Sequence, residues 1–134
     1  MAARTKLSAG VLPLARSTGR VLVGYRSQFS YEPYTWAAFG GSKDPEDETL
    51  ADTALRELFE ETGYAGPITL APGENVAHER TMGHIFLGIV PKEFRPKLNW
   101  EHSAARWVHL DQLDPDELHW SLQQLLSAQA RPCR

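Results

Sequence analysis

Residues 40–64 constrain the fold of this 134-residue chain more than any other stretch, because they read as one loop, turn and helix. Gly40 and Gly41 predict a glycine loop, and the acidic residues that follow predict a turn. A helix then runs to Gly63, which stands where a helix favours a left-handed C-terminal residue. Successive residues of a helix are about 100° apart, so five apolar side chains share one side of it: Leu50, Ala51, Ala54, Leu55 and Leu58.

The same helix carries a cluster of carboxylates. Glu57, Glu60 and Glu61 stand at i, i+3 and i+4, which predicts a shared face beside the apolar one. These like charges repel one another and lie near the C-terminal end, where the helix dipole disfavours negative charge. Arg56 is the only basic residue between positions 49 and 64. We therefore interpret the cluster as a functional site. Its ligand atoms would all be oxygens, which favours Mg²⁺ or Mn²⁺ as the bound ion.

At these residues the chain resembles the Nudix hydrolase family, whose box reads G-x5-E-x7-R-E-U-x-E-E-x-G-U, with U a bulky apolar residue. From the first glutamate onward, eight positions match in spacing: Glu48, Arg56, Glu57, Leu58, Glu60, Glu61, Gly63 and Tyr64. Two departures precede the helix. Six residues rather than five separate Gly41 from Glu48, which we interpret as a one-residue loop insertion, and Phe39 stands where many relatives have proline.

The resemblance implies cleavage of a phosphoanhydride bond in a nucleoside diphosphate linked to another group, with divalent cations as cofactors. By the same resemblance Glu60 and Glu61 are metal ligands, and Glu57 is either a third ligand or the general base. The carbonyl of Gly40 is a further ligand, and Arg56 orients a glutamate of the box through a charge-assisted hydrogen bond.

Outside the box, relatives often draw another acid from a loop before the last strand, where this chain has Glu101. Glu101 is either the general base, a further metal ligand or an ordinary loop residue. The neighbouring His102 is expected to be a surface histidine. Glu48 is expected to support the site near the helix start.

Substrate recognition is less defined. Phe29, Tyr31 and Tyr34 precede the box in an aromatic loop, where their rings either stack on a base or pack the loop onto the core. Arg26 is expected to meet a phosphate, and Trp100 to form a substrate wall.

The rest of the chain alternates apolar segments with turn residues. We expect strands at residues 6–14, 20–25, 35–39, 67–70, 76–80, 84–90 and 105–110. Asp114 is expected to cap a final helix that has Pro115 at its first position. Strands with a central and a terminal helix indicate an α+β fold, and the resemblance implies an α/β/α sandwich with a mixed β-sheet.

Composition fits one small enzyme. The length suits a single domain over residues 1–134, with residues 128–134 as a frayed tail. A net charge of −3 gives no basic field for a nucleic-acid polymer. There is neither a signal peptide nor a membrane-length apolar run, and Cys133 is the single cysteine, so we expect a cytoplasmic protein.

The expected partners are a small nucleotide-type substrate and a second copy of the chain in a homodimer, with no membrane. Two alternatives to the hydrolase stay open. An isoprenyl diphosphate isomerase of the same fold needs a catalytic cysteine, and the only cysteine here is near the C-terminus. A non-catalytic nucleotide-binding module usually lacks box glutamates, which this chain retains.

Overall fold

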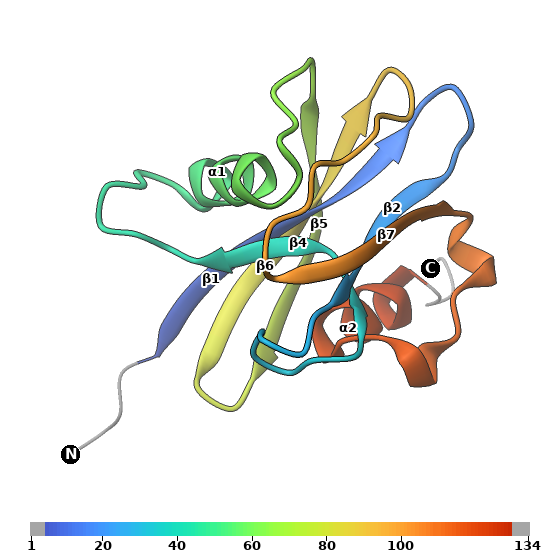
Figure 1. The fold of residues 1–134 in the computed structure, drawn as a ribbon. Helices are drawn as coiled ribbons and strands as arrows, with labels where there is room; N and C mark the ends of the chain where they lie inside the picture. Colours follow the sequence, from blue (N-terminus) through green and yellow to red (C-terminus); the bar gives the residue numbers. More distant parts are fainter. Residues whose placement is uncertain (1–4, 130–134) are drawn as a thin grey trace, which may run out of the picture.

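A computed structural model describes residues 5–129 of the chain. It contains two α-helices, α1 (Leu50–Thr62) and α2 (Trp120–Gln129), and two short 3-10 helices, η1 (Leu110–Gln112) and η2 (Pro115–Glu117). The strands are β1 (Lys6–Ala15), β2 (Val21–Arg26), β3 (Trp36–Ala37), β4 (Phe39–Ser42), β5 (Thr69–His78), β6 (Thr81–Val90) and β7 (His102–Val108). Figure 1 shows their arrangement.

The seven strands form one mixed sheet, which confirms that prediction. The order is β3-β2-β1-β6-β5, with β4 paired to β1 and β7 paired to β2. β1 and β6 are parallel along their whole length, and the other pairs are antiparallel. Pro13 lies in the interval of β1 between Val11, which pairs with β4, and Leu14, which pairs with β2. A proline, which lacks an N–H group, is tolerated at such a break.

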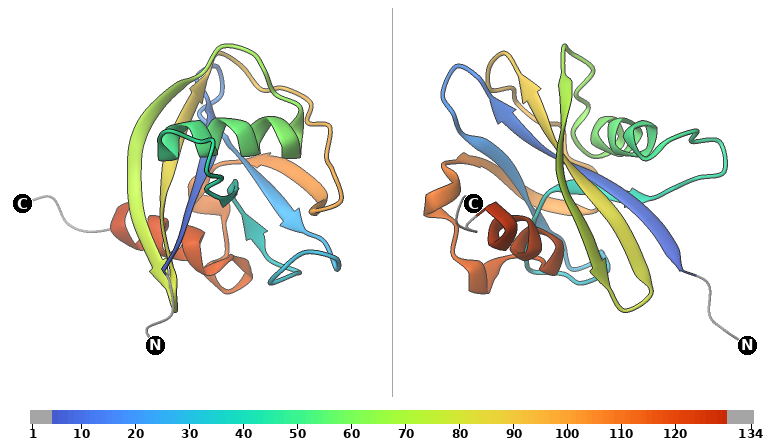
Figure 2. Two further views of the ribbon diagram at one scale, coloured as in Figure 1. Left: turned by 90° about the vertical axis from the view of Figure 1, so that its left-hand side faces the viewer. Right: turned by 180° about the vertical axis from the view of Figure 1, so that it is seen from behind.

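The two α-helices cover opposite faces of the sheet (Figures 1 and 2). α1 packs on β1, β4 and β6, whereas α2 packs on β5 and β3. Because successive strand residues point to opposite faces, Val11 of β1 joins the core under α1 and Leu12 joins the core under α2. The α/β/α sandwich predicted from the family resemblance is therefore confirmed.

Both ends of α1 are capped. The Thr49 hydroxyl accepts from the Asp52 amide, and the Asp52 carboxylate accepts from the Thr49 amide. Gly63 has φ +75° and its amide donates to the Phe59 carbonyl, as the sequence predicted. The predicted apolar stripe is correct at its centre, where Ala54 and Leu58 are buried, but Leu55 is exposed.

Three local predictions are wrong. Gly40 and Gly41 belong to strand β4 rather than to a loop. The two strands predicted at residues 67–70 and 76–80 are one continuous strand, β5, and the turn expected between them at residues 71–75 is a bulge, because an extra residue shifts the register against β6. Asp114 caps the short helix η2, and α2 begins only at Trp120.

The predicted tail at residues 128–134 begins inside α2, which ends at Gln129, and its last five residues lie outside the described part of the chain. Within residues 5–129, no helix has the length and apolar character needed to cross a membrane.

Candidate active site

Glu61 is a wholly buried carboxylate on the inner side of α1. Its Oε1 atom accepts from the Gly40 amide of β4 at 3.2 Å, whereas its Oε2 atom has no hydrogen-bond partner among the residues that the structure describes. The helix turns this side chain toward the sheet, while Glu60 is half-exposed and paired with Arg56. The single acidic face expected from the spacing is therefore divided between the interior and the surface.

Two further carboxylates converge on Glu61. Burial, together with the contact with Glu57 and the charge of Glu101, raises the pKa of Glu61 to about 11. The pKa of Glu101 is also raised, by burial and then by the charge of Glu57. Without a cation, Glu61 is therefore protonated at neutral pH, and its O–H group can donate a hydrogen bond to a neighbouring carboxylate.

This arrangement fits a divalent cation. Ligand atoms of Glu61, Glu101 and His102 lie within 4.8 Å of one another, and Glu61 brings an oxygen that nothing else in the described residues satisfies. A buried, unpaired carboxylate oxygen is costly unless a proton or a metal ion compensates it. Glu57 stands beside this group and lines the adjoining pocket. For Gly40, the contact that the structure shows is made by its amide, and ligation by its carbonyl stays a prediction.

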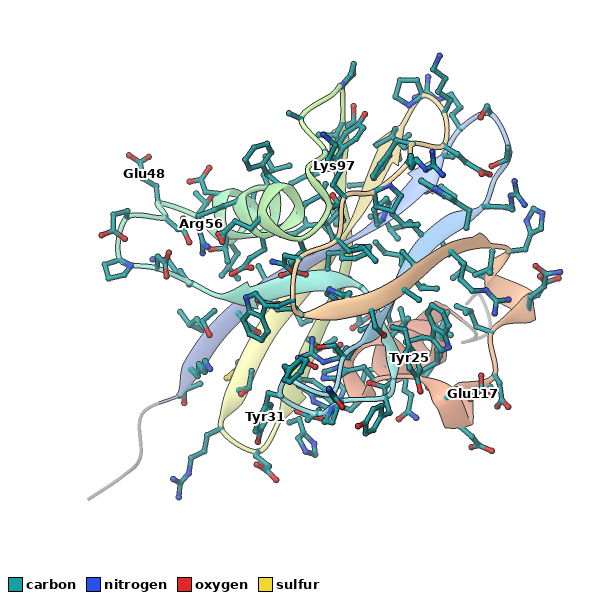
Figure 3. The ribbon with its side chains drawn as sticks, in the orientation of Figure 1. Tyr25, Tyr31, Glu48, Arg56, Lys97 and Glu117 are labelled. Carbon is teal, nitrogen blue, oxygen red and sulfur yellow. The ribbon has the colours of Figure 1, made fainter. Side chains whose placement is uncertain are left out.

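Arg56 ties the start of α1 to the carboxylate cluster. Its guanidinium donates to Asp47 at 2.9 and 3.2 Å, to Glu57 at 3.2 Å and to Glu60 at 3.0 Å. Asp47 is buried, and the hydrogen bonds from Arg56 hold the pKa of its carboxyl well below the usual range. Glu48, which the family resemblance implied as a supporting residue, is exposed and points outward (Figure 3). Sequence reasoning therefore missed Asp47, one residue earlier.

The two glycines of β4 let the backbone approach its neighbours closely. A Cβ atom on Gly40 would collide with the Ala9 carbonyl and lie 2.6 Å from Cα of Gly10, both in β1. A Cβ atom on Gly41 would collide with the Glu57 carboxylate, 2.6 Å from its Cδ atom. Gly40 thus serves strand pairing, and Gly41 leaves room for a site carboxylate.

Alanine at these two positions should separate folding from activity. In Gly41→Ala the obstacle is the flexible end of Glu57, so we expect turnover to fall about tenfold or more while the melting temperature changes little. In Gly40→Ala the obstacle is backbone, so we expect clear destabilisation. Thermal unfolding and steady-state kinetics on both variants check this. A Gly41→Ala enzyme with unchanged turnover would contradict the placement of Glu57.

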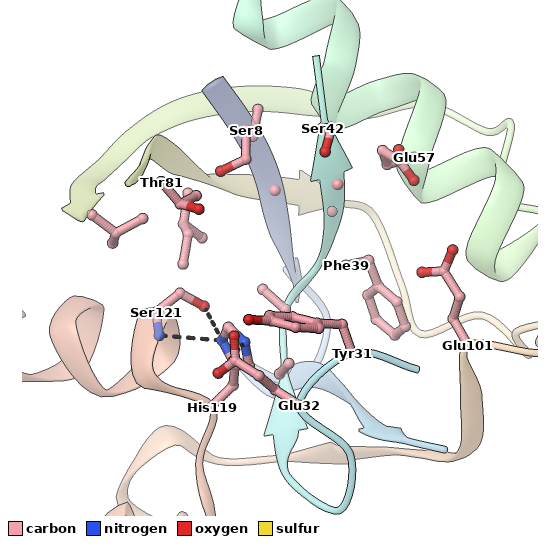
Figure 4. A pocket seen from close by; sticks show the side chains of 18 of the residues that line it. Ser8, Tyr31, Glu32, Phe39, Ser42, Glu57, Thr81, Glu101, His119 and Ser121 are labelled. Atoms are coloured by element: carbon pink, nitrogen blue, oxygen red, sulfur yellow. Dashed lines mark hydrogen bonds and ion pairs between the residues drawn. The ribbon is translucent and has the colours of Figure 1, made fainter. Parts of the chain in front are cut away.

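A pocket of about 440 Å³ opens in front of the carboxylates. Glu57 and Glu101 lie at one end of it, and Glu32, His119 and Ser121 lie at the other (Figure 4). The ring of Tyr31 stands between these ends. An elongated pocket of this kind suits a substrate with a charged part and an organic part.

The structure separates the predicted substrate residues into two groups. Arg26 and Trp100 line the pocket, whereas Phe29 and Tyr34 are exposed and are absent from its described lining. The Arg26 guanidinium donates to the Tyr31 carbonyl at 2.8 Å, so part of it holds the aromatic loop. Substrate contacts by these four residues stay predictions.

The expectation that His102 is a surface histidine is wrong. Its side chain is 3% exposed, not on the surface, and it packs against Phe39 at 5.0 Å between ring centroids. Burial lowers its pKa to about 4, so the imidazole is neutral at pH 7. The last strand was predicted to start at residue 105, and its actual start at His102 brings this residue into the sheet.

Comparisons with known proteins agree with this geometry. A family model of the NUDIX domain matches residues 4–129. Among solved structures, a MutT protein from Methanosarcina mazei Go1 is similar with a TM-score of 0.76 and 24% identity, covering 96% of this chain and 94% of that one. The E. coli dihydroneopterin triphosphate pyrophosphohydrolase has a TM-score of 0.74 and 24% identity, covering 94% and 97%.

An Ap4A hydrolase of C. elegans has a TM-score of 0.74 and 22% identity, covering 92% of this chain and 95% of that one. No curated protein matched the chain significantly. At these identities the structural likeness establishes the fold, while the family model spans nearly the whole chain. The chain therefore belongs to the Nudix family of hydrolases.

Proposed function

We propose that this protein is a divalent-metal-dependent pyrophosphohydrolase that cleaves a phosphoanhydride bond in a nucleoside diphosphate linked to another group. One observation carries the proposal: the buried carboxylate of Glu61 meets Glu57 and Glu101 at one end of a pocket of about 440 Å³. Without a cation the crowding of these acids keeps Glu61 protonated, whereas a bound cation would make all three carboxylates favourable ligands.

Different residues of the chain would bind the cation, orient its ligands and accept a proton. Glu61 and Glu101, with Glu57 and Glu60 as further candidates, would hold Mg²⁺ or Mn²⁺, which when bound neutralises phosphate charge and activates water. Arg56 fixes Glu57 and Glu60 through its hydrogen bonds. Glu57 and Glu101 both line the pocket, and one of them would accept the proton of the attacking water.

The substrate class is supported by the pocket and by the relatives. The similar structures include enzymes named for dihydroneopterin triphosphate and Ap4A, both with a polyphosphate and a heterocycle. In this chain the carboxylate end would receive the polyphosphate with its cations, and the end at Glu32 and His119 would receive the organic group. We also propose that the protein is cytoplasmic and forms a homodimer.

The two alternatives have less support. The isomerase requires a cysteine in the site, and Cys133 lies outside the described residues. A purely binding module would have no need for a buried carboxyl with a raised pKa next to two other acids.

A hydrolysis screen tests the proposal. The panel contains nucleoside triphosphates, sugar nucleotides, ADP-ribose and dinucleoside polyphosphates, each with Mg²⁺, with Mn²⁺ and with EDTA, and products are separated by chromatography. We expect metal-dependent cleavage of one class at a phosphoanhydride bond. Tight binding of a nucleotide without any cleavage by the folded, metal-loaded protein would favour the binding module.

Trp100 and Phe29 offer a matched test of substrate recognition. Both are exposed aromatic residues, at 63% and 73%, but only Trp100 lines the pocket. Loss of a stacking ring costs about 1–3 kcal/mol per base, so Trp100→Ala should raise KM about tenfold. Phe29→Ala should leave KM unchanged. The reverse pattern would show that the substrate lies over the aromatic loop instead.

A further inference from the structure

A bulge in β7 turns His102 toward the carboxylate site. β2 and β7 pair in steps of one residue from Val21↔Val108 to Tyr25↔Ala104, but Arg26 then pairs with His102, so Ser103 is an extra residue. Directly opposed residues share a face of the sheet. Bulges of this kind re-aim side chains next to active sites.

The face that His102 joins is the one covered by α1. On this face Leu22 of β2 is buried in the core under α1, and its partner Trp107 packs against the same core. Arg26 has the same parity along β2 as Leu22, so its partner His102 also points to the α1 side. Without the bulge, Ser103 would occupy this position.

The sheet also makes room for the ring. A Cβ atom on Gly24 would lie 2.6 Å from Cδ2 of His102 and 2.8 Å from Cε1 of Phe39. The imidazole therefore occupies space that any larger residue at position 24 would take. The bulge and this glycine together bring an imidazole next to Glu61.

The ring makes none of the polar contacts that would explain its burial. Within residues 5–129 neither Nδ1 nor Nε2 has a hydrogen-bond partner, although the side chain is only 3% exposed. Nδ1 lies 3.9 Å from Oε1 of Glu61, too far for a hydrogen bond. Two ligands that share one ion at about 2.1 Å are separated by roughly 3 to 4 Å, so this spacing suits a common metal ion.

We infer that His102 is a nitrogen ligand of the cation held by Glu61 and Glu101. This inference rests on the proposed metal site and adds a consequence for ion choice. Imidazole is a ligand for first-row transition ions, whereas Mg²⁺ takes oxygen ligands and water. The site should therefore bind Mn²⁺ more tightly than Mg²⁺.

Pulsed EPR of the full-length protein loaded with Mn²⁺ alone gives a direct test that needs no substrate. Electron spin echo envelope modulation should show a coordinated ¹⁴N nucleus in the natural protein. The signal should disappear in His102→Asn and persist in His84→Asn, which removes another pocket histidine. Because the first measurement uses the natural protein, it decides the question even if a variant does not fold.

Competition binding gives the second readout. Asparagine supplies an oxygen near the position of Nδ1, so His102→Asn should weaken Mn²⁺ binding about tenfold or more and leave Mg²⁺ binding nearly unchanged. Bound Mn²⁺ without ¹⁴N coupling would overturn the role of His102 while preserving the metal site, as would equal losses for both ions. Failure of the natural protein to bind Mn²⁺ at all would overturn both the inference and the proposed function.

Discussion

Glu61→Gln should abolish most of the activity and at the same time stabilise the metal-free protein. Glutamine keeps the shape of the protonated acid, its oxygen still accepts from the Gly40 amide, and its amide group can donate to Glu57 or Glu101. It cannot offer a charged oxygen to a cation. Because a bound cation contributes several kcal/mol to the transition state, we expect turnover to fall about 10³-fold.

The stability gain follows from the raised pKa of Glu61. In the unfolded chain this carboxyl ionises near its ordinary pKa of 4.5, whereas in the folded protein it ionises near 11. The group therefore favours folding below pH 4.5, and this contribution is lost progressively as the pH rises toward 11. At pH 7 this shift lowers the free energy of unfolding of the metal-free protein by roughly 3 kcal/mol. Glu61→Gln has no such loss, because glutamine does not ionise.

Three measurements check this prediction. Without metal, Glu61→Gln should unfold at a higher temperature than the natural protein at pH 8, and the difference should vanish near pH 4. With saturating Mn²⁺ the order should reverse, because only the natural protein gains from binding. Calorimetry in buffers of different ionisation enthalpy should show proton release when Mn²⁺ binds the natural protein.

Glu46→Gln is the matched control, since it removes an exposed glutamate outside the pocket. It should change neither turnover nor the pH dependence of unfolding. If Glu61→Gln retained nearly full turnover, the metal assignment would be wrong.

The sequence predicted the parts of this fold that local chemistry determines. The helix α1, its glycine cap and the apolar pair Ala54 and Leu58 follow from spacing alone. The mixed sheet and the sandwich came from the family resemblance, because strand order depends on contacts between distant segments. Gly40 and Gly41 were assigned to a loop because glycine usually marks one. Here their lack of a side chain serves close approach within a strand.

Prediction of the site from the sequence was limited in the same way, by contacts between distant segments. The helical spacing brought Glu57, Glu60 and Glu61 together, but it could not tell which carboxylate would be buried, because this depends on how α1 lies on β4. The bulge that turns His102 inward leaves no signature in the spacing of β7. Asp47 was overlooked because its partner Arg56 lies nine residues away, across the turn that precedes the helix.

Asp47 and Glu48 are therefore the most informative neighbouring pair for mutagenesis. The family resemblance implies a supporting role for Glu48, whereas in the structure Asp47 makes the bidentate contact with Arg56. The Asp47 carboxylate also accepts from the Thr53 hydroxyl at 2.9 Å and from the Asp44 amide at 2.9 Å. Replacement by asparagine removes its charge and turns an N–H₂ group toward at least one of these donors.

We expect Asp47→Asn to lower turnover about 10- to 100-fold, because Arg56 then holds Glu57 and Glu60 less firmly. The melting temperature at pH 7 should fall by about 5 °C. Glu48→Gln should alter neither quantity, since its side chain is exposed. Equal losses in the two variants would show that Glu48 supports the site as much as Asp47 does, and would contradict the special role given to the Asp47–Arg56 contact.

The pH dependence of unfolding separates this charge effect from a simple packing defect. The pKa of Asp47 is lowered, chiefly by hydrogen bonds from Arg56, so its contribution to stability is complete above the ordinary pKa of 3.8. It is lost as the pH falls below that value toward the folded-state pKa. The gap in melting temperature between the natural protein and Asp47→Asn should thus be constant from pH 5 to 8 and narrow below pH 4. A gap that persists unchanged into strong acid would mean that asparagine disturbs packing and that the Asp47–Arg56 ion pair adds little to the fold.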